Sequence, residues 1–140
     1  MEIKDKNGKL LAMVIDYESV EQSKYFATEN NHELQVAAFN LDKNEEIIKH
    51  IHPPQQRNIK TTSEVLIVLK GQIEYEIYDE KLEFCKSGIV ESGNMLVLIN
   101  GGHGLKMLED AKFIEVKQGP YDESIDKAVS YTHLTLPTTP

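Results

Sequence analysis

The spacing of turn-forming residues most constrains how this chain can fold. Turn signals recur roughly every eight to twelve residues, as at Gly71, at 91–94 and at 100–102. Short apolar runs rich in β-branched residues lie between them, and each run is shorter than a typical helix. The pattern therefore predicts an all-β sandwich or barrel and disfavours alternating βαβ units.

The strand candidates follow from these runs. Residues 64–69 are continuously apolar after the first, whereas residues 72–78 alternate apolar side chains with glutamates. We expect these two strands to form a hairpin about Gly71, the first buried on both faces and the second on one. Residues 17–26 are ambiguous and allow a short helix. The other expected strands are 10–15, 34–39, 46–52, 82–85, 95–99, 105–107 and 112–117.

Length, charge and cysteine content narrow the class of protein. The chain has 140 residues, of which 40% are hydrophobic, so it can bury the core of one domain. A net charge of −8 disfavours nucleic acid or an anionic membrane as a partner. Cys85 is the single cysteine, which excludes an internal disulfide. Because the N-terminus lacks the apolar core of a signal peptide and no run is long enough to span a bilayer, we expect a cytoplasmic location.

Composition changes abruptly at residues 129–140. This segment has no charged residue and carries four threonines and two prolines. It resembles the translated end of a transposase-type sequencing adapter, which implies a non-native tail and a natural sequence that stops near Lys127 or Ala128. His133 is then discounted as a functional residue. The alternative is a genuine Thr/Pro tail.

Two histidines and two further residues suggest a metal site. On the expected strand 46–52, His50 and His52 are two residues apart and would face the same side. Glu64 begins the next strand, and His103 follows a glycine pair. Imidazole nitrogen and carboxylate oxygen suit a divalent ion such as Fe, Mn, Ni or Zn, and a set of four leaves coordination positions open for a substrate. The alternative is a pair of solvated histidines on a half-exposed strand.

These residues also match a family pattern. His50-Ile51-His52, then Glu64, then six residues and Gly71 resemble the first motif of the cupins. A second motif maps onto Gly93-Asn94, the run 95–99 and His103. The interval from His52 to Glu64 is longer than in the family pattern, and Ser92 stands where a proline is common.

The resemblance implies a fold and a division of the chain. The implied fold is a single cupin barrel, a double-stranded β-helix or jelly-roll, of the small metalloproteins associated with sugar metabolism. Residues 1–33 would be a strand and loop extension, with a short helix, packing on a barrel of residues 34–121. Residues 122–128 would be a truncated C-terminal segment, and residues 129–140 the non-native tail. Cupins often pair through sheet edges, so a homodimer stays open.

The resemblance also implies a function without identifying a catalytic residue. His50, His52, Glu64 and His103 would hold the metal, which would assist isomerisation or epimerisation of a small polar molecule such as a sugar or sugar nucleotide. An Fe(II)-dependent dioxygenase and a non-catalytic small-ligand-binding cupin are the alternatives. Whether the chain is an enzyme at all is left open.

Three further side chains are candidates for substrate contacts. Arg57 and Gln55 lie in the loop after His52, where a guanidinium could bind an anion and an amide could bind hydroxyls. Tyr75 alternates with apolar residues and could point its phenol into the cavity. The alternatives are surface pairing for Arg57, solvation for Gln55 and core packing for Tyr75.

Overall fold

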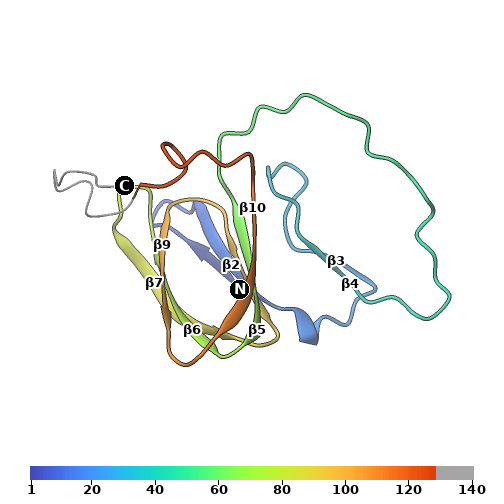
Figure 1. Ribbon diagram of the computed structural model, residues 1–140, viewed down its shortest axis with the longest axis horizontal. Helices are drawn as coiled ribbons and strands as arrows, with labels where there is room; N and C mark the ends of the chain where they lie inside the picture. Colours follow the sequence, from blue (N-terminus) through green and yellow to red (C-terminus); the bar gives the residue numbers. More distant parts are fainter. Residues whose placement is uncertain (129–140) are drawn as a thin grey trace.

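Two antiparallel sheets pack face to face in the computed structural model, which describes residues 1–128 (Figure 1). The larger sheet has the order β1 (Glu2–Lys4), β2 (Leu10–Asp16), β8 (Asn94–Leu98), β5 (Glu64–Lys70) and β10 (Lys112–Lys117). The smaller has the order β7 (Phe84–Glu91), β6 (Gln72–Tyr78) and β9 (Gly102–Met107). The all-β prediction is confirmed, and among the described residues neither sheet closes into a barrel. The expectations for residues 129–140, including His133, lie outside the described part.

The larger sheet is buried on both faces. One core lies between the two sheets, and a second core lies on the other face of the larger sheet. Along β5, Leu66 and Val68 face the first core while Val65 faces the second. Burial on both sides explains why these strands are nearly continuous apolar runs. The alternation predicted for β6 is confirmed, since Ile73 and Ile77 are almost fully buried in the first core.

The predicted hairpin between the runs on either side of Gly71 is wrong. β5 pairs with β8 and β10, whereas β6 pairs with β7 and β9 in the other sheet. Both edges of β5 are therefore occupied, and no edge remains for β6. Gly71 has φ +84° at this crossing, and a Cβ there would lie 2.3 Å from the carbonyl oxygen of Asp110. Only glycine allows the chain to turn so tightly from one sheet into the other.

The predicted strand 46–52 is also wrong. Residues 40–63 contain no helix or strand, and they form an arch that stands away from the sandwich (Figure 1). Ile48 and Ile51 are more than 80% exposed. A strand requires a neighbour to complete its backbone hydrogen bonds, and this segment has none among the described residues. Pro53 and Pro54 follow directly and cannot donate a hydrogen bond.

The first forty residues contribute to both the large sheet and a separate hairpin. β1 and β2, assigned from the sequence to an extension, are strands of the five-stranded sheet. Instead of a helix over 17–26, a 3-10 turn spans Tyr17–Ser19, and β3 (Lys24–Phe26) pairs with β4 (Ala37–Phe39). That 3-10 turn is the only helical element of residues 1–128, and it is far too short to cross a membrane.

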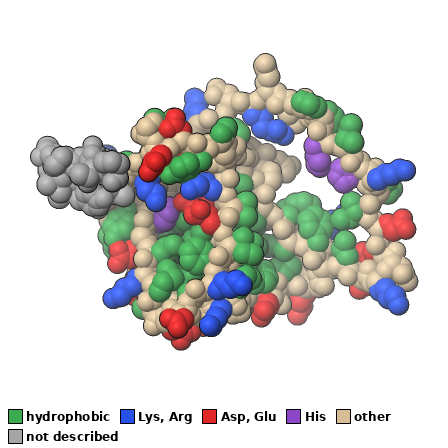
Figure 2. Space-filling view, in the orientation of Figure 1, with side chains coloured by type: hydrophobic (Ala, Val, Ile, Leu, Met, Phe, Trp, Pro, Cys, Tyr) green, Lys and Arg blue, Asp and Glu red, His purple; other side chains and the backbone are tan. Residues whose placement is uncertain are grey.

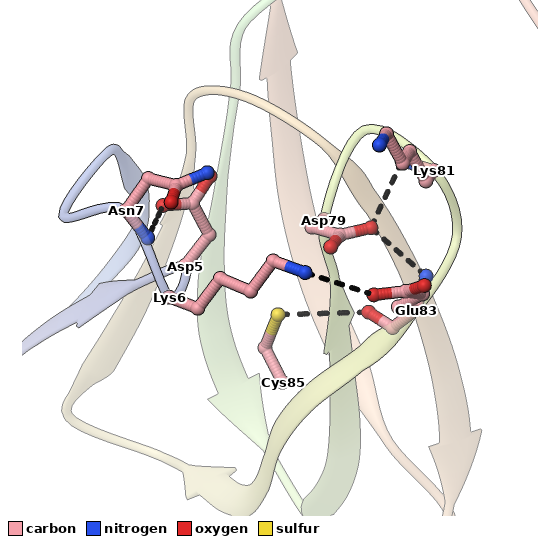
Figure 3. Close-up of polar contacts among 7 residues, drawn as sticks. All are labelled: Asp5, Lys6, Asn7, Asp79, Lys81, Glu83 and Cys85. Atoms are coloured by element: carbon pink, nitrogen blue, oxygen red, sulfur yellow. Dashed lines mark hydrogen bonds and ion pairs between the residues drawn. The ribbon is translucent and has the colours of Figure 1, made fainter.

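A tight turn joins β6 to β7 at one end of the sandwich (Figure 3). Asp79 is buried, and its Oδ1 accepts hydrogen bonds of 2.9 Å from the backbone nitrogens of Lys81 and Glu83. Lys6, from the turn after β1, lies 4.0 Å from the Glu83 carboxylate. The side chain of Cys85 donates to the Glu83 carbonyl at 3.5 Å. Of these contacts, the one between Lys6 and Glu83 links the end of the smaller sheet to the N-terminal turn.

Candidate functional site

Glu64 and His103 meet where the edges of the two sheets approach each other. Glu64 is the first residue of β5 and has the parity of the core residues Leu66 and Val68. His103 lies on β9 in register with Ile77 of the same core. Both side chains therefore point between the sheets, and Oε1 of Glu64 lies 3.2 Å from Nε2 of His103. The imidazole side chain is 31% exposed, so this pair lies at the partly exposed rim of the core, a place that we call the opening.

The surroundings of Glu64 favour its ionised form. The hydrogen bond from His103 lowers the pKa of Glu64 to about 2, against the opposing effect of burial, with smaller contributions from Glu115 and the charges of His103 and Lys117. Glu64 is consequently a carboxylate at neutral pH. An ionised carboxylate beside an imidazole nitrogen can bind a metal ion or a donor group of a ligand.

Glu115 and Lys117 extend this site along β10. Lys117 is the register partner of Glu64, and Glu115 is two residues away on the same face. The hydrogen bond to Glu64 raises the pKa of Glu115, and burial acts in the same direction. Nζ of Lys117 lies 3.7 Å from Oε2 of Glu115 and 5.1 Å from the ring centroid of Tyr121. The opening therefore contains two carboxyl groups that share a hydrogen bond, one imidazole and one ammonium group.

Sequence reasoning missed Glu115 and Lys117, although a signal was present. The strand 112–117 was predicted with the bounds that the structure shows for β10. Phe113 packs against the core between the sheets. Since alternate residues of a strand share a face, Glu115 and Lys117 must face the same side as Phe113. Reading the period of this strand would have placed both charges beside Glu64.

His50 and His52 lie on the exposed arch of residues 40–63. Their rings pack edge to face, with centroids 5.0 Å apart and an interplanar angle of 74°. Nδ1 of His50 lies 2.7 Å from the carbonyl oxygen of Ile48. Figure 2 shows histidine side chains on the arch, apart from the histidine over the body of the sandwich.

The structure thus arranges the four predicted ligands as two separate pairs. Glu64 and His103 form one pair at the opening, and His50 and His52 form the other on the arch. Within residues 1–128, no group of three or more His, Cys, Asp or Glu side chains is arranged to hold a metal ion. The metal set stays a prediction.

The three predicted substrate contacts occupy different environments. Arg57 and Gln55 are exposed on the arch, near His52 in sequence. Tyr75 is 2% exposed within the core between the sheets, and burial raises the pKa of its phenol. Its ring lies across Gly88, its register partner on β7, where a Cβ would come within 2.4 Å of the phenol oxygen. Tyr75 therefore packs as part of the core, and its hydroxyl end lies against Gly88.

Comparison with protein-family models, curated proteins and solved structures found no match to this chain.

Proposed function

We propose that this chain is a cupin-type metal-binding protein that acts on a small polar molecule, such as a sugar or sugar nucleotide, by metal-assisted isomerisation or epimerisation. The observation that carries the proposal is the pair of Glu64 and His103, which converge from opposite sheets to 3.2 Å at an opening of the core. In proteins with a β-barrel, the mouth of the barrel is a common place for a small-ligand site.

The donor types at this opening fit a divalent transition metal, but their number does not complete a site. Glu64 is ionised because its pKa is about 2, and imidazole with carboxylate suits Fe, Mn, Ni or Zn. A catalytic ion usually takes about three protein ligands, and here two converge. Glu64 and His103 therefore form half of the proposed site, and a metal held there would polarise a carbonyl or hydroxyl group of the substrate.

His50 and His52 would supply the other half if the arch closes over the opening. The arch leads directly into β5, so the chain between His52 and Glu64 is a short tether. An extended chain spans up to about 3.3–3.6 Å per residue, so this tether is long enough to bring the histidines back to Glu64. β9, which carries His103, is the last strand of its sheet, and its free edge lies beside the opening. The exposed isoleucines of the arch would lose water contact in the same movement.

Closure would also bring a cation to the opening. Arg57 lies on the arch a few residues after His52, and Lys117 is already within 3.7 Å of Glu115. An arginine can bind a carboxylate or phosphate with two parallel hydrogen bonds. Arg57 would therefore orient the anionic part of a substrate such as a sugar nucleotide, and Gln55 would bind its hydroxyl groups.

A jelly-roll barrel is part of this proposal. Two face-to-face antiparallel sheets with a crossing at Gly71 are consistent with it. An Fe(II)-dependent dioxygenase would use the same four ligands. A non-catalytic ligand-binding cupin would use the opening without turnover.

Metal content of the purified protein tests the proposal. The protein is supplied with Fe(II), Mn(II), Ni(II) or Zn(II) under reducing conditions, desalted and measured by elemental analysis. We expect about one ion per chain, and a loss of at least tenfold in affinity for His103→Ala and for His50→Ala. His32→Gln is the matched control, because His32 lies outside the proposed set and should leave metal content unchanged.

Three outcomes separate the alternatives. A protein that stays metal-free with every ion contradicts the proposal. Retained metal with sugar-nucleotide isomerisation supports it, whereas retained iron with oxygen uptake moves the reaction to the dioxygenase alternative. Retained metal without turnover of either kind favours the non-catalytic ligand-binding alternative.

A further inference from the structure

The outer face of the three-stranded sheet carries two neighbouring aromatic rings. Tyr78, the last residue of β6, follows Ile77 of the first core and so points away from that core. Its register partner on β7 is Phe84, which is 60% exposed. The ring centroids lie 5.9 Å apart, and the interplanar angle is 77°. Because most of Phe84 is exposed, this pair of rings is accessible from solvent.

A carboxylate adjoins the two rings. Glu76 lies two residues before Tyr78 on the same face, and the Tyr78 hydroxyl donates a hydrogen bond to its Oε2. That hydrogen bond above all raises the pKa of Tyr78, so the phenol is neutral and keeps its proton at pH 7. The register partners of Glu76 are Ser87 on β7 and Gly104 on β9. Both are small, and even a Cβ at Gly104 would lie 3.9 Å from the carboxylate, so neither neighbour covers it.

No basic side chain of residues 1–128 neutralises this carboxylate. The ion pairs of this part of the chain do not include Glu76, and its cation–π contact lies elsewhere, between Lys117 and Tyr121. A carboxylate and the electron-rich faces of aromatic rings both attract a positive charge. The net charge of −8 adds a long-range attraction for cations. The rings and the carboxylate therefore suit a cation that comes from outside the described chain.

A second exposed aromatic pair shows what distinguishes this one. Phe26 and Phe39, on the hairpin of β3 and β4, have ring centroids 6.1 Å apart and an interplanar angle of 81°. They are 65% and 51% exposed. The register partner of Phe39 is Lys24, so a positive charge lies beside this pair. The ring geometry is similar at the two places and the neighbouring charge is opposite, which makes the hairpin pair a control within the same molecule.

We propose that Glu76, Tyr78 and Phe84 form a binding site for a small organic cation of the quaternary ammonium class. The methyl groups of such a cation would lie against the rings, with its charge near the carboxylate. A primary ammonium group is strongly hydrated and would lose that water on an apolar ring. The site is independent of the Glu64–His103 opening, because His103 faces the core from the other side of the smaller sheet.

A titration with tetramethylammonium chloride, followed by the backbone amide signals in NMR, tests this site. The salt replaces sodium chloride at constant ionic strength, so that charge screening stays the same. We expect saturable shifts at Glu76, Tyr78 and Phe84, whereas the aromatic pair on β3 and β4 should not respond. tert-Butanol, a neutral molecule of similar size, should bind more weakly by a factor of about five. An absence of saturable shifts, shifts centred elsewhere, or equal affinity for tert-butanol overturns the proposal.

Two variants and one matched control assign the contacts. Phe84→Leu keeps an apolar side chain without the ring, and Glu76→Gln keeps the size of the side chain without its charge. Each should weaken tetramethylammonium binding by a factor of about two to five. Phe39→Leu, which removes a ring from the control pair, should bind it like the unmodified protein. Unchanged amide signals in the larger sheet establish that each variant is folded, and an affinity that is unchanged in Phe84→Leu or in Glu76→Gln contradicts the site.

Discussion

Nε2 of His103 lies 3.2 Å from Oε1 of Glu64, and this side-chain contact joins the two sheets at the rim of their shared core. The two residues belong to strands that share no backbone hydrogen bonds, since β5 and β9 lie in different sheets. Side chains alone hold the sheets together at this point. Changes to either residue should therefore affect both the stability of the sandwich and the shape of the opening.

Replacement of Glu64 by glutamine tests the contribution of this pair to stability. Glu64→Gln removes the charge but keeps the size of the side chain, so we expect the free energy of unfolding to fall by about 1–2 kcal/mol in the partly exposed setting. Urea denaturation at pH 7 measures the change. Glu109→Gln, at an exposed turn, is the control and should change stability by less than about 0.5 kcal/mol. Equal effects of the two variants would rule out a stabilising pair.

The two carboxyl groups at the opening should have pKa values that are shifted in opposite directions from the ordinary glutamate value. Glu64 has a lowered pKa of about 2. Its contribution to the free energy of unfolding is therefore complete above about pH 4.5 and is lost as the pH falls towards 2. Glu115 has a raised pKa, so its contribution is present below about pH 4.5 and is lost as the pH rises through its folded value. Carboxyl carbon NMR shifts should report both titrations.

Replacement of the imidazole provides the check on this assignment. Because the hydrogen bond from His103 is the largest cause of the low pKa, His103→Gln should move the Glu64 titration back towards 4.5. Two carboxyl groups that both titrate near 4.5 in the unmodified protein would contradict the hydrogen-bonded arrangement.

Gly71 and Gly8 provide a matched pair for the crossing between the sheets. Their φ angles are +84° and +85°, but a Cβ at Gly71 would lie 2.3 Å from the Asp110 carbonyl, whereas a Cβ at Gly8 would have no atom within 4 Å. Gly8→Ala should lower the free energy of unfolding by about 1–2 kcal/mol, because an alanine is strained at this φ angle. Gly71→Ala adds a steric clash with the backbone and should cost at least about 1 kcal/mol more. Thermal unfolding compares the stability of the two variants directly. Equal losses of stability would contradict the close approach of Gly71 to the Asp110 backbone.

Tyr75 and Gly88 should be energetically coupled. A Cβ at Gly88 would lie 2.4 Å from the phenol oxygen of Tyr75, so Gly88→Ala should lower the free energy of unfolding by about 1–3 kcal/mol. The Tyr75→Leu variant lacks the ring, so Gly88→Ala should lower the free energy of unfolding by less in that background. A double-mutant cycle in urea measures the difference. Gly104→Ala, where the nearest atom is 3.9 Å away, is the control for glycine replacement in a strand.

The arch should be the first part of residues 1–128 to be cut by trypsin. Residues 40–63 have no strand or helix, and Lys49 and Arg57 are exposed on it. Brief digestion should cleave after these two residues before it cleaves after Lys70 in β5, as mass spectrometry of the fragments would show. If the arch closes on a metal, Zn(II) or Fe(II) should slow both cuts. Early cleavage within β5 would contradict the stability assigned to the sandwich.

Sequence patterns predicted which residues are buried better than they predicted which strands are neighbours. The alternation along β6 and the bounds of β10 follow from local period, so both were predictable from the sequence. The pairing of β5 was not, because an apolar run shows that both faces are buried but not which strands flank it. The family resemblance put Glu64 and His103 in one set with His50 and His52, and in the structure Glu64 lies beside His103 while His50 and His52 lie on the arch. The residues 46–52 have the composition of a strand, but a strand forms only where a partner edge is available.

β8 lies between β2 and β5 in the larger sheet, and this position determines the order in which the chain can fold. During synthesis, β2 and β5 leave the ribosome before β8, so neither has the strand that lies between them in the folded sheet. At about 5–20 residues per second, several seconds separate the appearance of β2 from that of β8. β2 is accessible to chaperones throughout this interval, and β5 is accessible from the time that it is synthesised. We therefore expect the yield of folded protein to depend on how long the ribosome takes to reach residue 98.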